Sequence, residues 1–75
     1  MNIPESIWKN PRLEVADKLI IGVILAGGGD TTTADIARET GISAKKAAQR
    51  INRLRQSGYI TVEKRDKTLH LEVAK

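Results

Sequence analysis

The chain has few of the residue types on which several kinds of functional site depend. It contains no cysteine, which excludes disulfides, thiolate metal sites and cysteine nucleophiles, and its single histidine, His70, cannot form a histidine metal cluster. The longest apolar run, residues 19–26, is interrupted by Gly22 and is too short to span a bilayer. Trp8 and Tyr59 are the only aromatic residues, too few for the stacking platforms that bind single-stranded nucleic acids.

The size and charge of the chain point to one small basic domain. Its 75 residues suffice for one core and not for two. Residues 1–42 carry four basic and six acidic side chains, whereas residues 43–75 carry nine basic and three acidic ones. The second half is therefore a candidate surface for a polyanion, although a merely soluble basic face would have the same charge. Residues 1–10 have no basic region typical of a signal peptide, so we expect a cytoplasmic location without a membrane partner.

Proline and glycine divide the chain into an N-terminal arm, residues 1–10, and a domain, residues 11–75. Asn10-Pro11 is typical of a helix start, with Asn10 as the cap and Pro11 at the first helical position. The helix is expected to end near Ala26, before three consecutive glycines. Apolar residues recur through it at helical spacing: Leu13, Ala16, Leu19 or Ile20, Val23 and Ile24.

Capping residues predict two further helices joined by a tight turn. Thr32 and Asp35 form a variant of the capping box at the start of the first of these. Gly41 ends that helix, and Ser43 caps the next one, which is expected over residues 44–57. Its inward positions are predicted to be Ala47, Ile51 and Leu54, followed by Gly58 as the helix stop.

After Gly58 the apolar period changes from 3.6 to 2, which predicts a β-hairpin. Pairing Val62 with Leu71 and Ile60 with Val73 keeps all four side chains on one face. That register fits a loop of either residues 66–67 or residues 65–68. We expect the four-residue loop, because Asp-Lys lacks the glycine that a two-residue turn favours.

This order of elements and its motif resemble a known family. The stretch Thr32-x-x-Asp35-Ile36-Ala37-x-x-x-Gly41-Ile42-Ser43 is similar to the winged-helix pattern T-x-x-E-L-A-x-x-x-G-I-S. The residues Ala47, Ile51, Leu54, Gly58 and Ile60 match the V-x-x-x-I-x-x-L-x-x-x-G-x-I that follows it. The resemblance covers residues 11–75 and implies a mainly α fold: three helices plus a two-stranded C-terminal β-hairpin, the wing. Within that family, Ile3-Pro4, Trp8 and Lys18-Leu19 resemble the winged-helix domains of plasmid and phage replication initiators and related mobile-element regulators.

The resemblance implies that the third expected helix enters the DNA major groove. Opposite its apolar face lies an arc of Lys, Gln, Asn and Arg side chains, which have the donors that read base edges and phosphates. We expect base-edge contacts from Lys45, Lys46 and Gln49. Phosphate contacts are expected from Thr33, Arg50 and Arg53 on the helices and from Lys64, Arg65 and Lys67 on the wing.

The first helix and arm contain more apolar residues than one small core needs. Ile3, Ile7, Trp8, Ile21 and Leu25 are predicted to form an interface, most simply that of a homodimer. The alternatives are an arm that folds over the helix within one chain and a second domain that covers it.

The predicted function is sequence-specific binding of double-stranded DNA, in a small transcriptional regulator or in the DNA-binding module of a replication or partition protein. The competing hypothesis is a winged-helix module that binds proteins without reading DNA. Neither hypothesis involves an enzyme, a cofactor, a metal or a small-molecule ligand.

Overall fold

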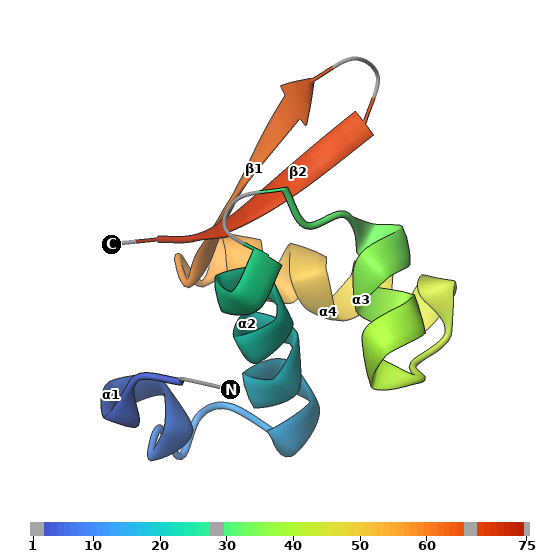
Figure 1. Cartoon of the computed structure of the whole chain (residues 1–75). Helices are drawn as coiled ribbons and strands as arrows, with labels where there is room; N and C mark the ends of the chain where they lie inside the picture. The colour runs from blue at the N-terminus through green and yellow to red at the C-terminus, as the bar shows by residue number, and fades with distance from the viewer. Residues whose placement is uncertain (1–2, 28–29, 66–67, 75) are drawn as a thin grey trace.

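The computed structural model describes residues 3–27, 30–65 and 68–74, which form four helices and one hairpin (Figure 1). The helices are α1 (Glu5–Trp8), α2 (Val15–Gly27), α3 (Thr33–Thr40) and α4 (Ala44–Gln56), and the strands are β1 (Ile60–Arg65) and β2 (Thr68–Val73). The hairpin extends from one end of the helical layer, and α1 lies at the opposite end (Figure 1). Within the described residues no helix is long and apolar enough to cross a membrane.

One core joins all the larger elements. Ile20, Ile21 and Ile24 of α2 pack with Ile36 of α3, with Ala47, Ile51 and Leu54 of α4, and with Ile60 and Leu71 of the strands. The periodicity left the choice between Leu19 and Ile20 open. Ile20 is fully buried, whereas Leu19 remains 40% exposed.

The start of α2 differs from the prediction. The expected helix start at Pro11 is wrong, because α2 begins at Val15. Residues 10–13 form a turn instead, in which the backbone N–H of Leu13 donates to the carbonyl of Asn10 and the Asn10 side chain accepts from the Arg12 N–H. Pro11 thus occupies the second position of a turn, which suits its fixed φ as well as a first helical position does.

The arm also differs from the prediction, because it contains the short helix α1 and raises the helix count among the described residues from three to four. Of the predicted interface residues, Ile21 is wrongly assigned, because it is fully buried in the core of its own chain. Ile7 packs against the core and is half-buried, as is Ile3. Trp8 and Leu25 remain 52% and 37% exposed.

The hairpin has the predicted register, with Ile60 opposite Val73 and Val62 opposite Leu71. The preferred four-residue loop is wrong, because Arg65 still pairs with Thr68 and only residues 66–67, outside the described residues, connect the strands. Cross-strand pairing therefore outweighs the poor turn preference of those two residues. A third segment joins the hairpin, since Thr31 forms an isolated antiparallel bridge with Leu71, whose N–H lies 2.9 Å from the Thr31 carbonyl.

Candidate nucleic-acid interface

The turn between α3 and α4 is fixed by local hydrogen bonds. The capping box is complete: Thr32 Oγ1 accepts from the Asp35 N–H at 3.2 Å, and Asp35 Oδ2 accepts from the Thr32 N–H at 3.0 Å. Gly41 ends α3 with a φ of 75°, which favours glycine. Ser43 Oγ then caps α4 by accepting from the Lys46 N–H. The predicted helix-turn-helix is confirmed, and its short turn sets the direction of α4.

The outward face of α4 carries polar side chains and two adjoining hollows. The described residues that line the outer hollow, of about 510 Å³, all come from α4: Lys46, Gln49, Arg50, Asn52 and Arg53. The wing-side hollow, of about 480 Å³, lies between α4 and β1 and is lined by Thr33, Ala48, Ile51, Asn52, Arg55, Val62 and Lys64. The outer hollow presents amide, guanidinium and ammonium groups, whereas the wing-side hollow combines polar groups with the apolar side chains of Ala48, Ile51 and Val62.

The predicted contact residues occupy several different environments. Lys45, Lys46 and Gln49 are exposed on α4, as are Arg53 on the same helix and Lys64 on β1. Thr33 is half-buried at the first position of α3 and faces the wing-side hollow. Arg65 ends β1, and Lys67 lies outside the described residues.

Arg50 is placed differently from the other predicted phosphate contacts. Its Nη2 lies 2.9 Å from Glu14 Oε2, and its Nη1 lies 3.3 Å from Asp17 Oδ1. These two hydrogen bonds, that to Glu14 first, raise the pKa of the Arg50 guanidinium above its usual value. A phosphate contact by Arg50 would therefore compete with an ion pair inside the domain.

Asn52 and Arg55 were not among the predicted contact residues. Arg55 Nη2 donates to Asn52 Oδ1 at 2.8 Å, and both side chains are exposed. The sequence does place Asn52 on the outward arc of α4, but it gives no signal for which side of the helix the wing adjoins.

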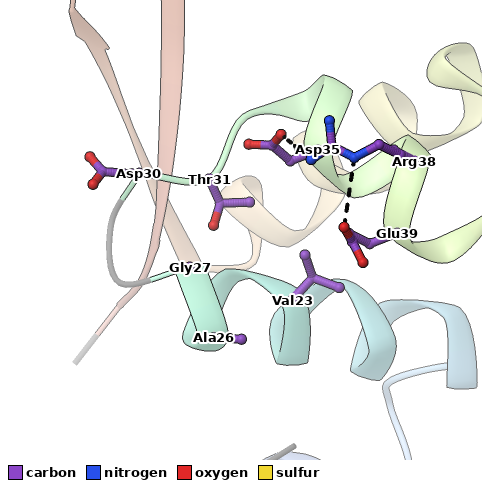
Figure 2. Close-up of a pocket in the computed structure, with 8 residues that line it drawn as sticks. All are labelled: Val23, Ala26, Gly27, Asp30, Thr31, Asp35, Arg38 and Glu39. Carbon is purple, nitrogen blue, oxygen red and sulfur yellow. Dashed lines mark hydrogen bonds and ion pairs between the residues drawn. The ribbon is translucent and has the colours of Figure 1, made fainter.

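A third hollow, of about 320 Å³, lies between the end of α2 and α3, and Asp30 and Thr31 of the connecting segment also line it (Figure 2). Val23, Ala26 and Gly27 form its α2 side. On α3, Arg38 pairs with both Asp35 and Glu39, as the dashed lines in Figure 2 show.

The carboxylate of Asp35 at this hollow stabilises the start of α3 by accepting from the Thr32 N–H. The backbone N–H of Thr32 is the main cause that lowers the pKa of Asp35, and the Thr32 hydroxyl and Arg38 lower it further. Within the described part of the chain, no group of three or more acidic, histidine or cysteine residues is placed to hold a metal ion. The polar side chains that pair here support the start of α3, so the surface of α4 remains the candidate interface.

Comparison with known proteins identifies the family. A family model described as winged helix-turn-helix DNA-binding matches residues 13–61, which is well over half of the chain. The chain therefore belongs to the winged helix-turn-helix DNA-binding family, and α4 is the second helix of its helix-turn-helix. No curated protein sequence matches the chain significantly.

Several solved structures of proteins described as DNA-binding, or solved with DNA, share the fold. BpsR of Bordetella bronchiseptica, whose DNA binding is regulated by 6-hydroxynicotinic acid, superposes with a TM-score of 0.73 at 18% identity, over 96% of this chain and 49% of BpsR. A predicted DNA-binding transcriptional regulator from E. coli superposes with a TM-score of 0.67 at 26% identity, over 77% of this chain and 61% of the E. coli protein. Streptococcus pneumoniae FabT, solved in complex with DNA, superposes with a TM-score of 0.72 at 18% identity, over 85% of this chain and 46% of FabT. The chain thus spans about half to three-fifths of each of these structures.

Proposed function

We propose that this domain binds double-stranded DNA in a sequence-specific manner, as the DNA-reading part of a transcriptional regulator. The observation that carries the proposal is the exposed face of α4, which presents Lys45, Lys46, Gln49 and Arg53 beside a wing that carries Lys64. Amide and ammonium groups on a helix that fits the major groove are donors for base edges, and the flanking cations neutralise phosphates. Such a partner also favours a cytoplasmic location, and the proposal includes no catalytic role.

Within this proposal the predicted contacts divide into two sets. Lys45, Lys46 and Gln49 lie in the first half of α4 and are assigned to base edges. The phosphate set is Thr33, Arg53, Lys64, Arg65 and Lys67, and Arg50 joins it only when DNA displaces Glu14 and Asp17.

Transcription is favoured over replication or partition because one of the superposed structures is described as a predicted DNA-binding transcriptional regulator. The protein-docking alternative requires no donor-rich face on α4. The basic and amide side chains kept there favour DNA.

Selection from random-sequence duplexes tests the proposal, followed by titration of the enriched duplex at several salt concentrations. We expect one enriched motif and a slope of log K against log salt of about −5 to −7, which corresponds to six to eight phosphate contacts. A slope near zero would remove duplex DNA as the partner and favour the docking alternative.

We also propose that the domain forms a homodimer through α1 and the outward face of α2. Trp8, Val15, Leu19 and Leu25 are exposed large apolar side chains in these helices, between 37% and 65% accessible. The Lys18 ammonium lies 5.6 Å from the centre of the Trp8 ring, which holds the indole against α2. A two-fold dimer would read two half-sites on the DNA.

Sedimentation equilibrium of wild type and Leu19→Lys at micromolar concentration tests the dimer. We expect twice the chain mass for wild type and one chain mass for the variant. A wild-type mass of one chain would reject the dimer.

A further inference from the structure

Asn52 lies at the centre of the recognition surface. It is the one described residue that lines both the outer hollow and the wing-side hollow, so its side chain stands on the ridge between them. Each hollow also holds cationic side chains that no acidic residue in the described part of the domain is shown to pair: Lys46 and Arg53 in the outer one, and Arg55 and Lys64 in the wing-side one. A duplex that neutralises both sets therefore passes over Asn52. The passage of a duplex over Asn52 rests on the proposed function.

The amide of Asn52 is oriented before any DNA arrives. Arg55, three residues later on the same face of α4, donates from Nη2 to Asn52 Oδ1 at 2.8 Å. A charge-assisted hydrogen bond of this length favours one orientation of the amide. The carboxamide still has a second lone pair on Oδ1 and two donors on Nδ2 for an external partner.

The chemistry of an oriented carboxamide selects one base. In the major groove, adenine presents the N7 acceptor beside the N6 amino donor, which match the Nδ2 donor and Oδ1 acceptor of asparagine in one plane. Guanine presents two acceptors there, which suit the nearby Lys45 and Lys46 better. We propose that Asn52 is a specificity-determining residue that reads an adenine of the target duplex, with Arg55 as its positioning residue.

Atom-by-atom substitution in the DNA tests this assignment. In the enriched duplex, each adenine is replaced in turn by 7-deazaadenine, which lacks the N7 acceptor. For the wild-type protein we expect one adenine at which the replacement weakens binding by about fivefold or more. For Asn52→Ala we expect no loss at that adenine, while the other positions behave as in wild type.

Variants of Arg55 and Arg53 test whether Arg55 positions the Asn52 amide. Arg55→Met keeps the length of the side chain but removes the donor, so preference at the adenine read by Asn52 should fall. The double variant Arg55→Met with Asn52→Ala should lose no further preference at that adenine. Arg53→Met, which removes a proposed phosphate contact, should lower the affinity for every duplex and leave the preference at that adenine as in wild type. Both Asn52 and Arg55 are exposed, so circular dichroism should show that every variant folds.

Two outcomes would overturn the inference. One is an Asn52→Ala variant with the same 7-deazaadenine profile as wild type. The other is an Arg55→Met variant with full preference at the adenine. Both presuppose a wild-type protein that selects a duplex, so they leave the proposed function standing. A wild-type protein without selection would instead remove the proposed function and this inference with it.

Discussion

The guanidinium of Arg50 in α4 is held by two carboxylates at the start of α2, with Nη2 2.9 Å from Glu14 and Nη1 3.3 Å from Asp17. Asp17 serves both helices, because its other oxygen accepts from the Glu14 N–H at 3.1 Å. The side chain of Asp17 is 14% exposed and that of Glu14 is 63% exposed. The contact with Asp17 is therefore the one protected from solvent, and it joins α4 to α2.

Removing the ion pair between Arg50 and Asp17 should lower the stability of the fold more than it lowers the affinity for DNA. Arg50→Met leaves the Asp17 carboxylate without its charged partner, and we expect the free energy of unfolding in urea to fall by about 1–3 kcal/mol. Glu14→Gln should change it by less than about 0.5 kcal/mol, because an exposed ion pair contributes little. Arg53→Met, which removes an exposed arginine of the same helix, is the control and should unfold like wild type. An Arg50→Met variant with wild-type stability and a smaller salt slope would show a phosphate contact instead.

The wing should contribute to affinity without contributing to sequence preference. Replacing Lys64 and Lys67 by Ala removes two cations from the hairpin, so the salt slope should become less negative by about 1.8, at about 0.9 for each phosphate contact. The motif selected from random duplexes should stay the same, because phosphate contacts carry no sequence information. Lys9→Ala is the control, since Lys9 pairs with Glu5 in α1, at the far end from the hairpin (Figure 1). A changed motif would mean that the wing reads bases.

The parts of the fold that the sequence predicts are those fixed within a few residues. Thr32 and Asp35 form the predicted capping box, and Ser43 caps α4 as predicted. Gly41 and Gly58 have the positive φ values expected of helix stops. Each of these interactions joins neighbours in the chain, so the pattern of residue types is sufficient to predict it.

The parts that the sequence does not predict depend on distant contacts. Asn10 was expected to cap a helix, but its Nδ2 donates to the hydroxyl of Tyr59, 49 residues later, at 2.8 Å. The carboxylates that hold Arg50 lie 33 and 36 residues before it. In the same way, periodicity places Asn52 outward on α4, but only the packed wing shows that it borders two hollows.

The close approach of Thr31 to α2 requires glycine at position 27. A Cβ at Gly27 would lie 1.8 Å from Thr31 Oγ1, and Thr31 is 3% exposed and bridged to Leu71. Helix propensity alone favours Gly27→Ala, but we expect the variant to lose about 1–3 kcal/mol of stability in urea unfolding, because this clash overpacks the site. In a Thr31→Ala background the same change should cost less, since the clashing hydroxyl is gone. Equal costs in both backgrounds would contradict the assignment.

The capping box should make stability depend on pH through Asp35. The Thr32 N–H, with the Thr32 hydroxyl and Arg38, holds the pKa of Asp35 below its usual value, so the folded state favours the carboxylate more than the unfolded chain does. This contribution is complete above the unfolded pKa of about 3.9 and is lost as the pH falls through the lower folded value. Asp35→Asn keeps an oxygen acceptor but does not titrate. Urea unfolding between about pH 6 and pH 2.5 should show stability falling less steeply in Asp35→Asn than in wild type, whereas parallel curves would mean that Asp35 is not the group responsible.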